Sequence, residues 1–234
     1  MSITARHLIY SILEIASSGG LPTDFSISEE LILHWIEETR SKLISQKLDK
    51  KDDINDSWVQ YIPCVGLALA DVSECCEAPI GCYVLKSTKR LPQTIDTWKD
   101  NSIISVSTLD GSLISKSNPF KHKYQKYNKY TSTINSWYIK NDYLYVINND
   151  FLELVEVALL AETPSDLKRF TDCGGNSCFN LDSNYPVSLT LATQITDIII
   201  KNKIAPFFTF SKDDSNNANS QTPQQKSQEK QANS

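Results

Sequence analysis

The chain has 234 residues, of which 40% are hydrophobic, and a formal net charge of -5. This length allows one large domain, or two small ones that share a core, followed by a tail. The acidic balance, with a pI near 5.3, argues against a protein whose whole surface binds polyanions, because its long-range field would repel them. Any contact with phosphate must come from a local basic patch.

The first 78 residues are predicted to be helical. Residues 3–16 place apolar side chains at helical spacing and end at a Gly-Gly pair. A second helix over about 27–48 follows Ser26 and Glu29, which have the spacing of a capping box. The expected apolar face carries Leu31, Ile32, Trp35, Ile36, Thr39, Leu43 and Ile44, and the expected polar face carries Glu37, Glu38, Arg40 and Lys42. Residues 58–72 resemble a third, mostly apolar helix that is broken near Pro63.

After residue 78 the hydrophobic period shortens and predicts an antiparallel β subdomain over residues 79–163. The strand candidates are CYVLK, SIISVST, SLISK, SWYIK, YLYVIN and LELVEVALLAE. Asp110-Gly111 and Asn141-Asp142 stand in hairpin positions, since these residue types tolerate the positive φ of tight turns.

The C-terminal part, residues 164–210, is predicted to return to helix. Pro164 opens a short helix or turn, and Pro186 precedes a last helix over about 187–203. Residues 211–234 contain no Leu, Ile, Val or aromatic side chain, so we expect a disordered polar tail. The predicted fold class is therefore α+β, in which N-terminal and C-terminal helices form a bundle around an inserted antiparallel β subdomain.

Catalytic patterns are missing from the sequence. It has no phosphate-binding loop, no dinucleotide fingerprint, no HExxH and no GxSxG. The three histidines, His7, His34 and His122, fall in separate predicted elements, and the first two are expected to be structural. Neighbouring carboxylates such as Glu37 and Glu38 point different ways on a helix and are expected to be solvated. We therefore expect no enzyme activity and no cofactor.

The N-terminus lacks the features of a signal peptide, and no apolar run approaches the roughly 18 to 20 residues needed to span a bilayer. The protein is thus expected to be soluble and not exported, with its cysteines reduced. The six cysteines are Cys64, Cys75, Cys76, Cys82, Cys173 and Cys178. Four of them could ligate zinc, but no C-x2-C pair occurs, so small buried apolar side chains are favoured over a metal site.

A run of lysines and tyrosines is the most distinctive local feature. No acidic residue occurs between Asp110 and Asp142, and we expect an exposed extended loop over residues 116–136. The candidate site residues in it are Lys121, Lys123, Tyr124, Lys126, Tyr127, Lys129 and Tyr130. They suit a subunit interface, a contact with a nucleic-acid backbone, or an ordinary solvated loop, and the interface is favoured because tyrosine is enriched at interfaces.

Several segments follow one another in a distinctive order: HWIEETRSKLI, WVQ at 58–60, Arg90-Leu91-Pro92, WYIKNDYLYV, Pro164 and Tyr185-Pro186. Their order and local sequence resemble the head-to-tail connector, or adaptor, ring proteins of crAss-like short-tailed bacteriophages. The resemblance covers most of residues 3–204.

This resemblance implies a structural virion protein of the neck or tail, assembled in the cytoplasm of a bacterial host. About a dozen copies would form a ring that binds the portal protein and other tail rings, and that extends the DNA channel. Contact with packaged DNA would be non-specific, and no membrane is involved. The alternatives are a nucleic-acid-binding module that uses the Lys/Tyr loop, and a small zinc-binding regulator.

Overall fold

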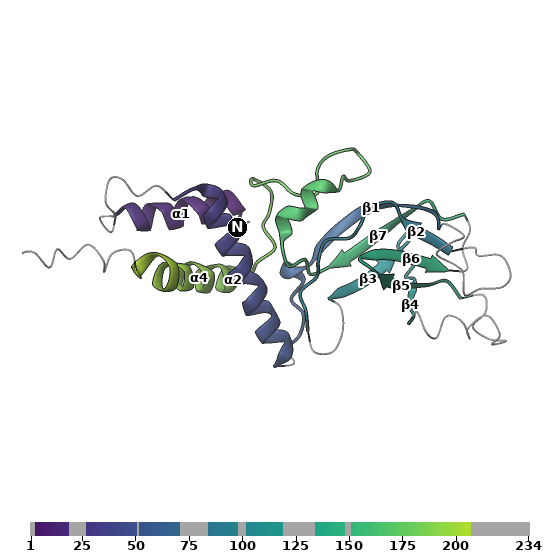
Figure 1. The fold of residues 1–234 in the computed structure, drawn as a ribbon, viewed down its shortest axis with the longest axis horizontal. Coiled ribbons are helices and arrows are strands. Elements are labelled where there is room, and N and C mark those ends of the chain that lie inside the picture. Colours follow the sequence, from purple (N-terminus) through teal and green to yellow (C-terminus); the bar gives the residue numbers. More distant parts are fainter. Residues whose placement is uncertain are drawn as a thin grey trace, which may run out of the picture.

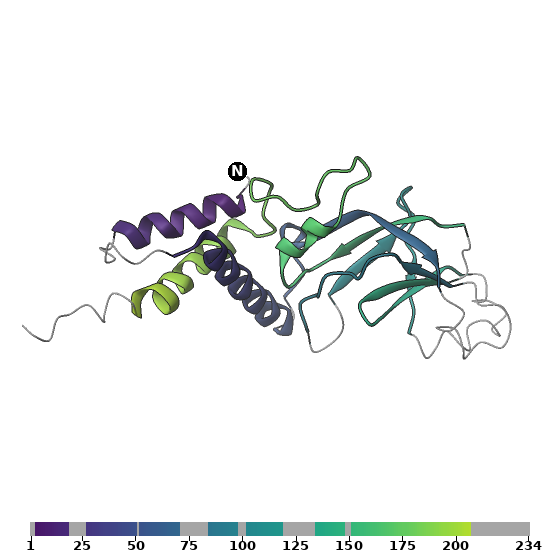
Figure 2. The same ribbon diagram turned by 45° about the horizontal axis from the view of Figure 1, so that its top comes forward.

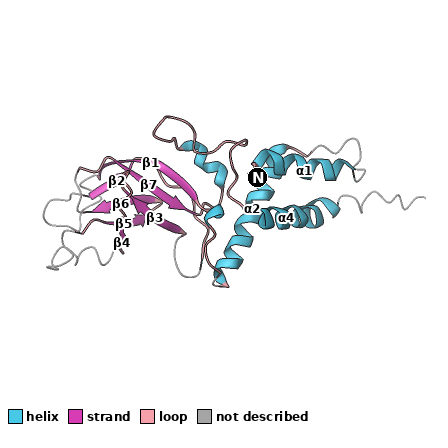
Figure 3. Ribbon diagram, turned by 180° about the vertical axis from the view of Figure 1, so that it is seen from behind, coloured by secondary structure: helices cyan, strands magenta, loops and turns pink. Residues whose placement is uncertain are grey.

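The structure, a computed structural model, describes residues 3–18, 27–50, 52–70, 84–97, 102–118, 134–147 and 151–206. The molecule is elongated, with its helices gathered at one end and its β-sheet at the other (Figure 1). The view from behind, coloured by secondary structure, shows the same separation (Figure 3). The mixed α+β class is confirmed.

Three helices share one hydrophobic core. They are α1 (Ala5–Ser18), α2 (Glu29–Asp49) and α4 (Leu189–Ile199), and a π-helical turn over Ile200–Ile204 extends α4. Their fully buried side chains include Ile12, Ile32, Ile36, Ile44, Ile195 and Ile199. In two views α2 crosses the other two helices at a steep angle (Figures 1 and 2). A shared core is therefore present, while the expected bundle arrangement stays a prediction.

The N-cap of helix α2 is Ser28, two residues after the predicted cap Ser26. The Ser28 hydroxyl accepts a hydrogen bond from the backbone N–H of Leu31 at 3.2 Å. This bond satisfies one of the donors that every helix start leaves free. Ser26, the predicted capping residue, lies outside the described residues. Within the described ranges, none of the helices combines the length and apolarity that a bilayer crossing requires.

Seven strands form one sheet in the order β3-β7-β1-β2-β6-β5-β4. Their bounds are β1 Gln60–Leu69, β2 Val84–Ser87, β3 Ile103–Ser107, β4 Ser115–Lys116, β5 Ser136–Lys140, β6 Tyr143–Ile147 and β7 Leu154–Leu159. All neighbours pair antiparallel except β4 and β5, which are parallel. Within the described residues, the five candidates CYVLK, SIISVST, SWYIK, YLYVIN and LELVEVALLAE are confirmed as strands, and SLISK contributes only the two residues of β4.

The sheet is nearly closed. On one side of the segment between Leu113 and Ser117, Leu113 bridges to Ser107 of β3, and the Ile114 N–H donates to the Val106 carbonyl at 2.9 Å. On the other side, β4 pairs with β5. Inward-facing side chains from most strands fill the interior as a second hydrophobic core, which includes Ile62, Val106, Leu144, Val146, Val155 and Val157.

The predicted helix over 58–72 is wrong, because this segment contains β1. A short apolar run does not distinguish a buried strand from a buried helix by periodicity. Pro63 is accommodated because the register between β1 and β7 shifts between Ile62 and Val65. Such an irregularity is where a residue without a backbone N–H fits in a sheet.

The two predicted turns are present. Asn141 and Asp142 join β5 to β6 with positive φ values of 52° and 65°, as a two-residue hairpin turn of this type requires. Gly111 also has a positive φ, 87°, in the turn after β3. The strand that follows that turn, β4, forms its ladder with β5 and not with β3.

Candidate assembly surface

The predicted site residues of the Lys/Tyr loop, residues 121–130, lie outside the described residues. The chain on either side of the loop is part of the sheet. Ser117 donates its backbone N–H to the Trp137 carbonyl at 2.7 Å, and Ser115 pairs with Ser136. Both attachment points of the loop are therefore held by β4 and β5, and the role of the loop itself stays a prediction.

A group of tyrosines and cations covers the outward face of β2, β6 and β5. We define this cation–tyrosine face as Lys86, Arg90, Tyr138, Lys140, Tyr143 and Tyr145, of which Arg90 and Lys140 are exposed and Tyr145 is buried. Register brings them together, because Tyr145 pairs with both Lys86 and Tyr138, and Tyr143 pairs with Lys140. Sequence reasoning placed the cations of interest in the loop and did not identify this face, although strand alternation in WYIKNDYLYV carries the signal.

Contacts within this face are aromatic and electrostatic. The rings of Tyr138 and Tyr145 stack with centroids 5.0 Å apart, and the Lys86 ammonium lies 4.1 Å from the Tyr143 ring centroid. Arg90 lies over the same Tyr143 ring and donates to the Tyr143 hydroxyl at 3.4 Å. That hydrogen bond raises the pKa of Arg90. The face therefore presents cations held over aromatic rings, which suits contact with an acidic and partly apolar surface.

Arg40 connects the helices to the sheet. Its side chain is 0% exposed and donates three hydrogen bonds of 2.8 to 2.9 Å to the carbonyls of Trp58, Ala161 and Pro186. Burial lowers the pKa of Arg40 to about 10, so it remains charged at neutral pH. Arg40 was predicted to lie on the polar, outer face of its helix, and that prediction is wrong, because the sheet and the segment before α4 cover it.

Glu37, one turn before Arg40, is also buried, which corrects the expectation of a solvated carboxylate. Its carboxylate accepts hydrogen bonds from the Ser165 N–H at 2.8 Å and from the Ser165 hydroxyl at 3.2 Å. Ser165 belongs to the short 3-10 helix η3 (Pro164–Arg169), which confirms the helical turn predicted at Pro164. Burial raises the pKa of Glu37, and the bonds from Ser165 oppose that shift.

Replacing Glu37 by Gln is expected to remove a pH dependence of stability. Because the folded pKa is raised, the native state takes up a proton at a higher pH than the unfolded chain does. The stabilisation from this proton is complete below the unfolded pKa of about 4.3 and is lost as pH rises through the folded pKa. Relative to E37Q, the wild type should therefore gain stability as the pH falls from 7 to about 4.3, as measured by urea midpoints. A difference that stays constant over this range, or that shrinks as the pH falls, would contradict the assignment.

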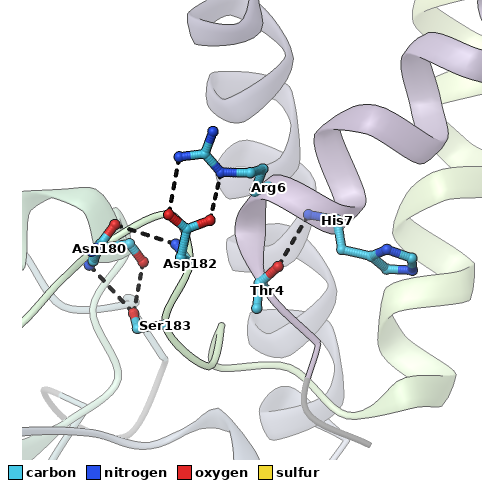
Figure 4. Close-up of polar contacts among 6 residues, drawn as sticks. All are labelled: Thr4, Arg6, His7, Asn180, Asp182 and Ser183. Atoms are coloured by element: carbon cyan, nitrogen blue, oxygen red, sulfur yellow. Dashed lines mark hydrogen bonds and ion pairs between the residues drawn. The ribbon is translucent and has the colours of Figure 1, made fainter.

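An ion pair fixes the start of α1 against the loop before α4. The Arg6 guanidinium meets the Asp182 carboxylate with two hydrogen bonds, one of them 3.0 Å long from Nη2 to Oδ2 (Figure 4). Thr4 bridges to Asn184, and the Thr4 hydroxyl accepts the backbone N–H of His7 at 3.1 Å. The His7 ring points away from this ion pair (Figure 4). These contacts connect parts of the chain far apart in sequence, and they hold no pair of catalytic groups.

Two cysteines that were expected to be reduced form a disulfide. Cys64 of β1 is bonded to Cys173 in the loop after η3, with Cα atoms 5.4 Å apart, a usual separation for a disulfide. The expectation of reduced thiols rested on the cell compartment alone, and for this pair it is wrong. Cys178 is free and half-buried, and burial raises its pKa. Cys75, Cys76 and Cys82 lie outside the described residues.

The other candidate groups do not converge on one site. His7 and His34 are exposed on α1 and α2, and His122 lies outside the described residues. Across the described ranges, no three His, Cys, Asp or Glu side chains come together as a metal site would require.

The sequence was compared with protein families and with curated proteins, and one of these two comparisons gives a match. A family model described as phage tail ring protein 2, of the crAss ring proteins, matches residues 7–229. The search of curated proteins finds no match. The match spans the helices, the sheet and the segment that contains the Lys/Tyr loop.

Proposed function

Because this chain belongs to the phage tail ring protein 2 family of crAss-like phages, and is thus a structural component of the virion tail, we propose that it forms one ring of the head-to-tail connector. About a dozen copies surround the channel for DNA below the portal, in contact with the portal and with other tail rings. The family match over residues 7–229 is the observation that carries this proposal. The family also points to a role without catalysis.

The shape of the subunit supports an assembly role. Helices and sheet occupy opposite ends of an elongated molecule (Figure 1), so one subunit can contact different partners at its two ends. The Lys/Tyr loop attaches at the start of β5, at the end of the sheet where Ser136 pairs with Ile147 and Ile147 with Val84. The opposite end of the sheet is the one next to the helices. There Gln60 of β1 pairs with Leu159 of β7, each two residues from a carbonyl that Arg40 binds, those of Trp58 and Ala161. We propose that the loop reaches a neighbouring ring from the far end, with its lysines free to meet DNA or an acidic surface.

Assembly of the purified full chain tests this proposal. We expect a closed ring by negative-stain microscopy and the mass of several subunits by light scattering, either for the chain alone or after mixing with the portal protein encoded by the same phage. A chain that stays monomeric with and without the portal, at concentrations that support assembly of other tail components, would contradict it. Deleting residues 119–133 should then weaken binding to the adjacent ring more than ring closure.

A further inference from the structure

Charge divides the strands of the sheet into two halves. In β1, β3 and β7 the single charged residue is Glu156, and Glu153, just before β7, has the same sign. The opposite half, β2, β4, β5 and β6, carries Lys86, Lys116 and Lys140 and no acidic residue. Within the strands themselves each half of the sheet therefore carries one sign of charge, and Asp142, in the turn between β5 and β6, adds one acidic group near Arg90.

The two halves face away from each other. In the nearly closed sheet, β7 and β6 are separated by β1 and β2 in one direction, and by β3, β4 and β5 in the other. Glu156 stands between Val155 and Val157, which are fully buried in the sheet interior, so it points outward. Tyr145 stands in the same way between Leu144 and Val146. Outward groups of opposite character thus lie on opposite walls of the same subunit.

The acidic wall also exposes apolar side chains. Tyr61 of β1 is 54% exposed and Leu154 of β7 is 37% exposed, and Tyr61 pairs with Ala158 beside Glu156. We define Tyr61, Glu153, Leu154 and Glu156 as the acidic face. Its mixture of apolar and anionic groups complements the cation–tyrosine face, where Arg90 and Lys140 are exposed and Tyr143 is half-buried.

A ring of identical subunits joins two different surfaces of each subunit, because every copy presents one surface to the copy ahead and another to the copy behind. We propose that the cation–tyrosine face of one copy docks on the acidic face of the next copy. This inference rests on the proposed ring and names its subunit contact. Tyrosine packing against apolar groups supplies contact area, and the opposite charges set the orientation of neighbouring copies.

The test is a charge reversal on each face, read out as ring formation at low salt. R90E/K140E and E153K/E156K should each need at least about tenfold higher concentration than the wild type to form rings, because each makes like charges meet. The matched control K42E/K201E reverses the same number of charges on exposed helical positions and should assemble like the wild type. Circular dichroism and thermal unfolding check that each variant is folded.

Restoration of charge complementarity separates this proposal from its alternatives. The quadruple variant R90E/K140E/E153K/E156K, and an equal mixture of the two double variants, should form rings again. Rings that persist in R90E/K140E would overturn the docking while leaving the proposed ring intact, whereas a wild type that never forms rings would overturn both. If neither combination restores rings, and the wild type but not R90E/K140E binds a short DNA duplex, the face contacts nucleic acid and the docking is wrong.

Discussion

Replacing Arg40 by Ala is expected to lower the free energy of unfolding by about 3 to 5 kcal/mol, since it removes three buried hydrogen bonds from a charged donor and leaves a cavity. The carbonyls of Trp58, Ala161 and Pro186 would lose their donor inside the junction between helices and sheet. These three acceptors come from three separate segments of the chain, so the loss affects the whole junction. Urea denaturation of the full chain measures the effect.

Two variants serve as controls for Arg40. Lys42 lies on the same helix and is exposed, so K42A should change stability by no more than about 0.5 kcal/mol. R40K keeps the charge but lacks the planar guanidinium that reaches three acceptors, so its loss should fall between those of the other two variants. All measurements need one assembly state, because ring formation adds its own stabilisation. An R40A variant that unfolds at the wild-type urea concentration would show that the junction does not depend on this residue.

Local signals in the sequence were sufficient where the structure depends on neighbouring residues. The hairpin at Asn141-Asp142 could be predicted because turn chemistry and strand alternation both act over a few residues. The type of α2 could be predicted for the same reason, but its cap could not, because Ser28 and not Ser26 is the N-cap. The prediction of helix for β1 was wrong because pairing decides the conformation of its ten residues. They pair with β2 and with β7, which lies far along the chain, and periodicity within the segment does not show this pairing.

Within the helices, the main wrong prediction was the placement of two buried charged residues on the outer face. An amphipathic pattern assigns every charged residue to the outer face, and Arg40 and Glu37 break that rule because their partners are distant in sequence. Arg40 bonds to Ala161, 121 residues away, and Glu37 bonds to Ser165, 128 residues away. Such pairs leave no periodic trace in a single sequence.

Three of the six segments that carried the family resemblance meet in space around Arg40. This residue belongs to HWIEETRSKLI, and its acceptors Trp58 and Pro186 belong to WVQ and Tyr185-Pro186. Half of the segments behind the resemblance to a crAss-like ring protein, which the family match confirms, therefore lie at the junction that joins the two ends of the subunit. The candidate site was harder to predict, because the cation–tyrosine face exists only after β2, β6 and β5 pair.

Removing the disulfide with the double substitution C64S/C173S is expected to lower the free energy of unfolding by about 2 to 5 kcal/mol. The bond joins residues 109 positions apart, so its loss gives the unfolded chain much more freedom, while few native contacts change. The unfolded state should also expand, which should steepen the dependence of stability on urea concentration. Cys173 is exposed, so dithiothreitol should reach the bond and reproduce the effect in the wild type.

Cys178 provides the matched control, because it lies five residues from Cys173 and is free. C178S should remain close to the wild type in stability and should keep the full sensitivity to dithiothreitol, since the Cys64–Cys173 bond is intact in it. C64S/C173S should show no further loss of stability in reductant. If the oxidised wild type and C64S/C173S unfold at the same urea concentration, the disulfide does not stabilise the fold. The loop after η3 would then be held against β1 by its other contacts.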